Sequence, residues 1–243
     1  MTPNIQPIEK PFMHDKGGLD FHSIFFTLQG EGPFSGDRSI FIRLAGCNLQ
    51  CPGCDTEYTE GRVLTMPSAL VAQADAICHE HEMEGPLIVI TGGEPMRQNL
   101  APLICLLLER GHRVQLETNG VLPPTPELES LVITQQVTLV VSPKTWKINP
   151  TTAALASCFK YVLRCGDIDI HDGLPTKALG HKVPAARRGV ARPPPEFYGT
   201  VYINPMDEQN AVHNKLNHDA CAASALMHGH RMGVQLHKIL NLE

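Results

Sequence analysis

The stretch of sequence that decides the fold covers residues 39–55 and reads SIFIRLAGCNLQCPGCD. Its first part is an apolar run over residues 40–44, which predicts a buried strand. The strand leads into a loop that carries Cys47, Cys51 and Cys54. This Cys-x3-Cys-x2-Cys spacing favours an iron–sulfur cluster, because cysteine thiolates are the ligands that hold such clusters. A cluster of four irons would keep one iron without a protein ligand, free to bind a small molecule.

A structural zinc site is the alternative interpretation of the same cysteines. Such a site needs four ligands in a closed shell. No further Cys or His lies within twenty residues on either side of the loop, and Asp55 is a poor structural substitute. Zinc would therefore require a ligand from a partner protein, in a non-enzymatic metal-binding module, and the spacing favours the cluster.

The composition excludes several classes of protein. A formal net charge of −5 and an aromatic content of 5% show no electrostatic footprint for nucleic acid. No apolar run approaches the length of a membrane span, and the N-terminus lacks the features of a signal peptide. The other five cysteines stand in or near apolar contexts and are expected to be reduced thiols of a cytoplasmic protein: Cys78, Cys105, Cys158, Cys165 and Cys221.

The rest of the chain alternates strand-like and helix-like patterns. Residues 1–20 show no periodicity and are expected to form a loose arm, and residues 21–243 a single domain. Helical spacing starts near Pro67 and recurs over 100–108 and 214–228. Short apolar strands are expected at 22–28, 40–44, 87–91, 113–117, 137–141, 159–163 and 200–203, with 234–237 ending the fold. This alternation predicts an α/β fold with a parallel sheet, either a partial (β/α) barrel or a doubly wound sheet.

Residues 166–198 depart from the alternation. The segment has five prolines and no helical period, and four of its residues between Lys177 and Arg188 are basic. We interpret it as a solvated insertion, so that deletion of residues 175–195 should leave turnover intact. A lid, or a docking site for an acidic partner, is the alternative.

The cysteine motif after a first strand resembles the radical S-adenosylmethionine superfamily. The flanking stretches 27–32, TLQGEG, and 54–56, CDT, are similar to those of the 7-carboxy-7-deazaguanine synthase family within it. The resemblance runs from about Phe21 to the C-terminus, apart from the insertion. It implies a partial (β/α) barrel of the shortened radical-SAM type with roughly six parallel strands, and a [4Fe-4S] cluster whose open iron binds S-adenosylmethionine.

The same resemblance implies a reaction. The enzyme would convert 6-carboxy-5,6,7,8-tetrahydropterin to 7-carboxy-7-deazaguanine with loss of ammonia, through a 5′-deoxyadenosyl radical. The electron that reduces the cluster would come from a flavodoxin- or ferredoxin-type reductant. The chain would form a homodimer. A radical activase that makes a glycyl radical on a partner protein is the alternative, but it gives no reason for the stretch 29–32 or for Thr56.

Roles for individual residues follow from the resemblance. Cys47, Cys51 and Cys54 would hold the cluster, and Thr56 would be the single protein ligand to Mg²⁺, which keeps most of its waters. The family usually has Gln at the position of Asn204, so only a backbone contact is expected there. Contacts to S-adenosylmethionine are expected from Gly53, Cys54, Asp55, Gly93, Glu94, Ser142, Pro143, Lys144, Asn204, Pro205, Met206 and Asp207.

The pterin site should combine donors and acceptors for a guanine-like edge. Arg43 could bind the substrate carboxylate as a fork. His237 and the terminal Glu243 match the family's closing segment, although His237 could instead be a core histidine on a strand. The full set of expected substrate contacts is Leu28, Gln29, Gly30, Glu31, Arg43, Thr91, Asn119, His237 and Glu243.

Overall fold

Nine strands form one continuous sheet in the order β3-β1-β2-β4-β5-β6-β7-β8-β9. The computed structural model describes residues 4–242 except 182, 185 and 188. The strands are β1 (Leu19–Leu28), β2 (Arg38–Leu44), β3 (Val63–Thr65), β4 (Leu87–Gly92), β5 (Arg113–Thr118), β6 (Val137–Val141), β7 (Cys158–Leu163), β8 (Thr200–Pro205) and β9 (Arg231–Met232).

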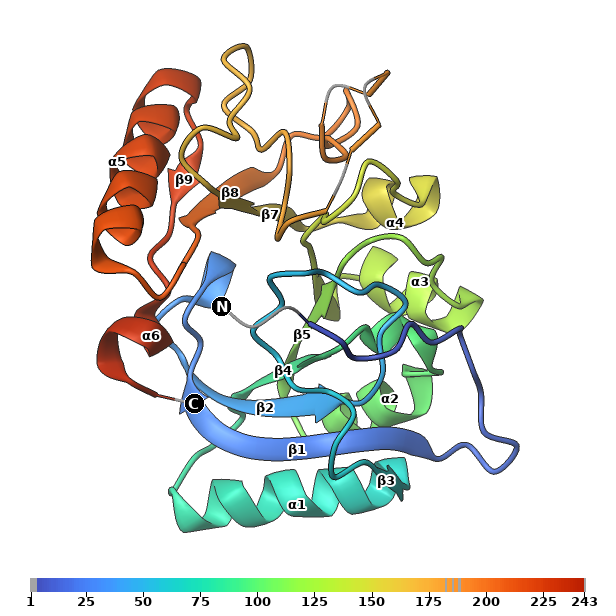
Figure 1. The fold of residues 1–243 in the computed structure, drawn as a ribbon. Helices are drawn as coiled ribbons and strands as arrows, with labels where there is room; N and C mark the ends of the chain where they lie inside the picture. The colour runs from blue at the N-terminus through green and yellow to red at the C-terminus, as the bar shows by residue number, and fades with distance from the viewer. Residues whose placement is uncertain (1–3, 182, 185, 188, 243) are drawn as a thin grey trace.

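The sheet is mostly parallel and open. From β2 through β9 every neighbouring pair runs parallel, whereas β1 pairs antiparallel with both β2 and β3. The sheet curves from β1 round to β9 without closing (Figure 1). This architecture confirms the expected partial barrel. Six of its parallel strands have five or more residues, which agrees with the expected number, and β9 adds a short seventh.

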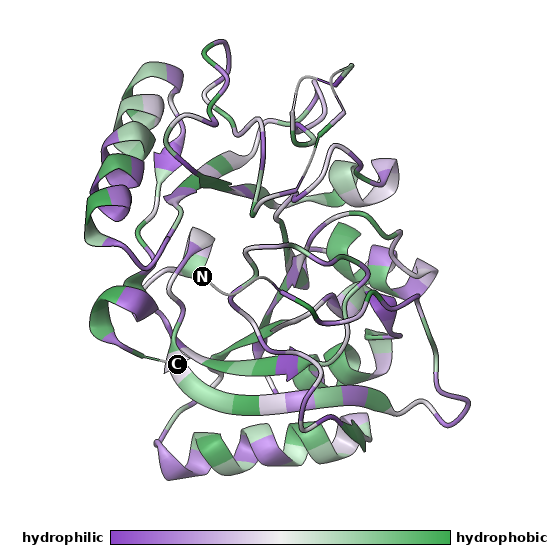
Figure 2. Cartoon of the chain, in the orientation of Figure 1, coloured by the Kyte–Doolittle hydropathy of each residue, from purple (hydrophilic) through white to green (hydrophobic). Residues whose placement is uncertain are grey.

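Five helices cover the outer face of the curve (Figure 1). They are α1 (Pro67–Glu80), α2 (Ala101–Glu109), α3 (Pro126–Ile133), α4 (Pro150–Leu155) and α5 (Ala211–His228). Pro at the first helical position opens α1, α3 and α4, where its missing N–H costs nothing. Hydrophilic and hydrophobic residues alternate along these helices, as expected for elements with one buried face (Figure 2). Among the described residues no helix is both long and apolar enough to span a membrane.

The end of the chain differs from the expectation. Residues 234–237 do not form a strand; instead α6 (Leu236–Leu240) follows the two-residue β9. His237 therefore lies on a short helix next to β1, and it is not a core histidine on a strand. Two 3-10 turns, η1 (Gly32–Phe34) and η2 (Pro95–Arg97), follow β1 and β4.

The N-terminal segment is attached to the cysteine loop and is not a loose arm over its described part. The backbone N–H of Asn4 donates to Pro52 O at 3.1 Å, and that of Glu9 donates to Cys47 O at 2.7 Å. Arg97, which is 3% exposed, donates to the Glu9 carboxylate at 2.9 Å. A buried guanidinium paired in this way anchors the segment across the inner side of the sheet.

The proline-bearing segment between β7 and β8 packs into the core, so the interpretation as a solvated insertion is wrong. Leu174, Ala178 and Val190 are each less than 5% exposed and belong to the main hydrophobic cluster. The hydroxyl of Tyr161 in β7 donates to Ala191 O at 2.8 Å. The crossover from β7 to β8 is thus made by irregular chain where a helix would be usual.

Candidate active site

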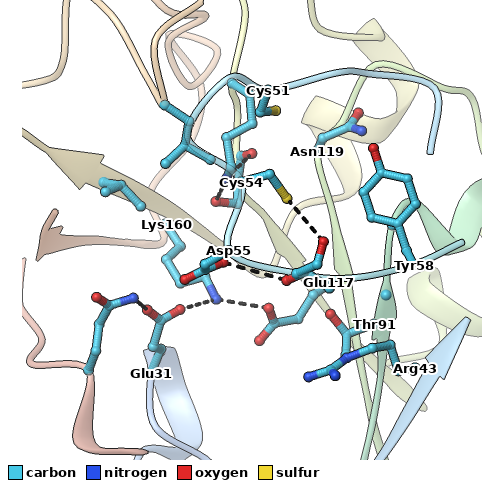
Figure 3. A pocket seen from close by; sticks show the side chains of 18 of the residues that line it. Glu31, Arg43, Cys51, Cys54, Asp55, Tyr58, Thr91, Glu117, Asn119 and Lys160 are labelled. Atoms are coloured by element: carbon cyan, nitrogen blue, oxygen red, sulfur yellow. Dashed lines mark hydrogen bonds and ion pairs between the residues drawn. The ribbon is translucent and has the colours of Figure 1, made fainter. Parts of the chain in front are cut away.

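A cavity of about 270 Å³ lies at the carboxyl ends of the parallel strands. This is the edge where α/β folds bind their ligands. The cysteine loop forms one wall, and the segment after β1, the ends of β2, β4, β5 and β6, and part of β7 form the others. Leu179, the segment after β8 and residues of the C-terminal segment, including Gln235 and His237, complete the lining. Figure 3 shows polar side chains from these elements pointing toward one another.

All three motif cysteines line this cavity as free thiols. Hydrogen bonds from Gly46 N to Tyr58 O (2.9 Å) and from Cys54 N to Cys51 O (3.1 Å) close the loop that carries them. Burial raises the pKa of Cys47 and of Cys51 to about 12. Coordination to iron would offset this cost, because a bound metal deprotonates the thiol.

The arrangement of these thiols fits a cluster better than a single ion. In the part of the chain that the structure describes, no three His, Cys, Asp or Glu side chains converge on one ion position. A structural zinc needs such convergence. In a cubane each cysteine binds a different iron, so the thiols need only face one common space.

The Gly-Gly turn after β4 packs directly against the cysteine strand. A Cβ on Gly92, whose φ is 135°, would lie 2.0 Å from Leu44 O, and one on Gly93 would lie 2.2 Å from Gly46 O. Only glycine allows this approach, which brings the Gly93 backbone to the cavity wall.

Glu94 holds the neighbouring loops together. Its buried carboxylate accepts hydrogen bonds from Met96 N (3.0 Å), the Thr118 hydroxyl (2.7 Å) and Asn119 N (2.8 Å). Burial raises the pKa of this carboxyl group. These bonds fix the ends of β4 and β5 relative to each other. Glu94 itself does not line the cavity.

The other expected S-adenosylmethionine contacts divide into two groups. Pro143, Asn204 and Pro205 do not line the cavity, and the side-chain polar atoms of Asn204 are buried without a hydrogen-bond partner among the described residues. Lys144 bonds back to Ser142, and burial lowers the pKa of its ammonium group. The second group consists of the expected contacts that do line the cavity: Gly53, Cys54, Asp55, Gly93, Ser142, Lys144, Met206 and Asp207.

A buried charge network lines the cavity on the side away from Cys51 (Figure 3). The ammonium group of Lys160 lies 2.6 Å from Glu31 Oε2 and 2.9 Å from Glu117 Oε2 (Figure 3). Gln29 donates to Glu117 at 3.2 Å, and Gln235 donates to Glu31 at 2.7 Å. Burial alone would raise the pKa of Glu31, but Lys160 outweighs it and holds that pKa at about 2.

Sequence reasoning missed Lys160, Glu117 and Gln235. A signal was present in β7, where Lys160 is the single charged residue of an otherwise apolar strand. A lysine buried in such a strand needs a carboxylate partner, which points to a polar site.

The remaining expected pterin contacts lie around this network. The guanidinium of Arg43 stacks on Phe25 at 5.0 Å from the ring centroid and has no ion-pair partner among the described residues. Asn119 donates to Asn48 at 2.7 Å, and Leu28 and Thr91 line the cavity. The expected role of Glu243 falls outside the described residues.

Gly30 and His237 form one unit. Gly30 lies behind the wall, and a Cβ on it would lie 2.0 Å from Nδ1 of His237, so the histidine occupies the space that a side chain would need. The backbone N–H of Leu236 also donates to Gly30 O at 3.1 Å. Burial lowers the pKa of His237. The two ends of the domain therefore meet at this cavity.

Comparison with known proteins identifies the family. Residues 28–140 match the model of a 4Fe-4S single cluster domain. A 7-carboxy-7-deazaguanine synthase from Rhodospirillum rubrum is 38% identical over 97% of this chain and 97% of that protein. The chain belongs to the 7-carboxy-7-deazaguanine synthase family. A second such synthase, from Rickettsia prowazekii, is 31% identical over 93% of this chain and 89% of that protein.

A solved structure supports the fold. The crystal structure of QueE from Escherichia coli covers 90% of this chain and 95% of its own, with a TM-score of 0.61 and 21% sequence identity. Membership in the 7-carboxy-7-deazaguanine synthase family makes the chain a radical S-adenosylmethionine enzyme with a [4Fe-4S] cluster. Neither the activase nor the zinc module is favoured, because full-length relatives carry the synthase name.

Proposed function

We propose that this chain converts 6-carboxy-5,6,7,8-tetrahydropterin to 7-carboxy-7-deazaguanine with loss of ammonia. The observation that carries the proposal is the 38% identity to a named synthase along almost the whole chain. The cavity adds physical support, since its lining combines the three motif thiols with the paired polar groups around Lys160.

Glu31, Glu117 and Gln29 suit the guanine-like edge of the pterin. That edge presents an amide and an amine, and carboxylates accept strong hydrogen bonds from such donors. Lys160 bonds to both carboxylates and fixes their positions, so the acceptors are oriented before the substrate arrives. Arg43, which has no ion-pair partner within the described part of the chain, would bind the substrate carboxylate.

Thr56 is proposed as the protein ligand to Mg²⁺. It lines the cavity next to Asp55, two residues after Cys54. Magnesium often takes one or two protein oxygens and fills its other positions with water and substrate oxygens. The substrate carboxylate would thus share the ion with Thr56.

Cys47, Cys51 and Cys54 would hold the cluster, with S-adenosylmethionine against Gly93, Ser142 and the segment after β8. When bound, the cluster supplies the electron that cleaves S-adenosylmethionine reductively. The chain positions both ligands, and the cysteine loop, the segment before β1 and the crossover from β7 to β8 keep solvent from the cluster side.

The direct test is an anaerobic incubation of the reconstituted protein with dithionite, S-adenosylmethionine, Mg²⁺ and the pterin, followed by mass spectrometry. We expect 7-carboxy-7-deazaguanine and 5′-deoxyadenosine from the wild type and neither from Cys51→Ala. 5′-Deoxyadenosine without the deazaguanine would overturn the substrate assignment but not the radical chemistry.

We also propose a flavodoxin- or ferredoxin-type reductant, a cytoplasmic location and a homodimer. Helix α5 exposes Leu216, Leu226 and Met227, and a second copy that covered them would remove apolar surface from water. Light scattering of the loaded protein measures the oligomeric state, and a monomeric mass would contradict the dimer.

A further inference from the structure

A tight turn from the proline-bearing crossover lies on the cysteine loop. His181 N donates to Ala178 O at 3.0 Å, and the two residues between them have left-handed φ values, 47° at Leu179 and 80° at Gly180. Two central residues of this kind define a type I′ turn. A branched aliphatic residue adopts this conformation only when its surroundings hold it there.

The surroundings that hold the turn belong to the cysteine loop. Leu179 O accepts a hydrogen bond from Gly53 N at 2.9 Å, and Leu179 itself lines the cavity. A Cβ added to Gly180 would lie 3.1 Å from Cβ of Pro52, so the turn sits in close contact with the loop. The turn is therefore built against the residues between Cys51 and Cys54.

The turn brings His181 to one cysteine. Nε2 of its ring lies 3.1 Å from Sγ of Cys51, which is itself 7% exposed. Once iron is bound, the sulfur of Cys51 is a thiolate that can only accept a hydrogen bond. The proton must then be on Nε2, which makes His181 the donor. Among the described residues, Cys47 accepts only a backbone N–H, from Leu49 at 3.4 Å.

We propose that His181 donates a hydrogen bond to the Cys51 ligand and thereby raises the reduction potential of the cluster. The reduced cluster carries one more negative charge than the oxidised one, so a donor at its sulfur stabilises the reduced form more. Hydrogen bonds to cluster sulfurs are an established way in which proteins set these potentials. His181 is a positioning residue for electron transfer and does not contact substrate.

The base of the crossover keeps this donor in place. Arg192 donates two bonds to Asp172, at 2.9 and 3.1 Å, and further bonds to the carbonyl oxygens of Pro175 and Val190, each at 2.8 Å. The guanidinium therefore connects the chain before the turn, at residues 172 and 175, with the chain after it, at residue 190. These hydrogen bonds hold the segment that carries His181 beside Cys51.

The test is the midpoint potential of the reconstituted cluster, measured by redox titration with electron paramagnetic resonance in the absence of pterin. In His181→Leu we expect about a tenfold lower ratio of reduced to oxidised cluster at a fixed potential, a downward shift of about 59 mV for one electron. His181→Gln keeps an amide donor and should recover much of the difference. Lys177→Ala, on the same segment but paired with Asp167, is the matched control and should not shift.

Equal potentials in all four proteins would overturn the proposal. If His181→Leu does not retain iron, the wild type decides instead, through pulsed electron paramagnetic resonance of the reduced cluster in protein labelled with ¹⁵N-histidine. A weak nitrogen coupling that is absent from His181→Gln supports the hydrogen bond. A missing coupling overturns it, and so does the strong coupling of a direct iron–nitrogen bond.

The inference depends on the cluster that the proposed function requires, but not on the substrate. A shifted potential in His181→Leu together with a wild type that makes no deazaguanine would refute only the substrate assignment. An unchanged potential in His181→Leu with normal product from the wild type would refute only the role of His181.

Discussion

At the residue scale, Gly30 and His237 predict a specific defect in substrate binding. A methyl group on Gly30 would lie 2.0 Å from the imidazole, so Gly30→Ala must push His237 out of the cavity wall. We expect KM for the pterin to rise by about tenfold, equivalent to about 1.4 kcal/mol, with little change in the affinity for S-adenosylmethionine. Steady-state kinetics with both substrates varied measures the two effects separately.

The double variant Gly30→Ala/His237→Ala is the control for this prediction. If the glycine acts only by making room for the ring, the second substitution adds little once the first is present. Fully additive losses would contradict the coupling, because they would mean that Gly30→Ala acts independently of the position of His237.

Glu31 predicts a pH dependence of stability. Because Lys160 holds its folded pKa at about 2, below its ordinary value of 4.5, ionised Glu31 stabilises the fold above pH 4.5. That contribution, on the order of 3 kcal/mol, is lost as the pH falls from 4.5 toward 2. Urea unfolding of the cluster-free protein should show this loss in the wild type and not in Glu31→Gln. Parallel curves would contradict it.

Residues of the site differed in how far sequence could predict them. The three cysteines could be singled out from sequence because their spacing is local and their chemistry is specific, and all three line one cavity. The network of Lys160 with Glu31 and Glu117 was missed because its members come from three separate segments, namely β7, the turn after β1 and β5. Lys160 alone indicated a polar site, but its two carboxylate partners could not be chosen from sequence, because only the folded sheet brings the three segments together.

At the scale of elements, the contacts of the N-terminal segment with the chain around Thr56 predict an effect on the magnesium dependence of activity. The side chain of Gln6 donates to Thr56 O at 2.9 Å and accepts from Tyr58 N at 2.8 Å, so it fixes the backbone on both sides of Glu57. Gln6→Ala should raise the Mg²⁺ concentration for half-maximal activity by about fivefold, as expected for about 1 kcal/mol of lost positioning. Activity titrations with Mg²⁺ measure it.

Ile5→Ala is the matched control, since that side chain is 88% exposed in the same segment. It should leave the magnesium dependence unchanged. An equal effect of both substitutions would mean that the whole segment matters through its attachment and that Gln6 has no particular role.

The long strands and helices were predictable, whereas the connecting segments were not. Val137–Val141 was predicted to the residue, and the long helix α5 to within three residues of its start, because burial on one or both faces marks them locally. The crossover from β7 to β8 has no period, so its burial depends on contacts that no local pattern encodes, such as Tyr161 with Ala191. Deletion of residues 175–195 is therefore expected to unfold the protein.

At the scale of the whole molecule, the cysteine loop is held from both sides. Residues 4–9 bond to it through Pro52 O and Cys47 O, and the 178–181 turn bonds to it through Gly53 N. These two segments are far apart in sequence and cover the inner side of an open sheet (Figure 1). A ligand that orders the loop should therefore stabilise the entire fold and not the loop alone.

Thermal unfolding of the loaded protein tests this coupling. S-Adenosylmethionine at a hundred times its Kd should contribute about 2.7 kcal/mol, which for a domain of this size raises Tm by roughly 5–11 °C. Cys51→Ala, which lacks a complete ligand set for the cluster, should show no shift with the same addition. A wild type that binds S-adenosylmethionine by calorimetry without a rise in Tm would mean that the loop opens before the sheet unfolds, and that its two attachments are weaker than the core beneath them.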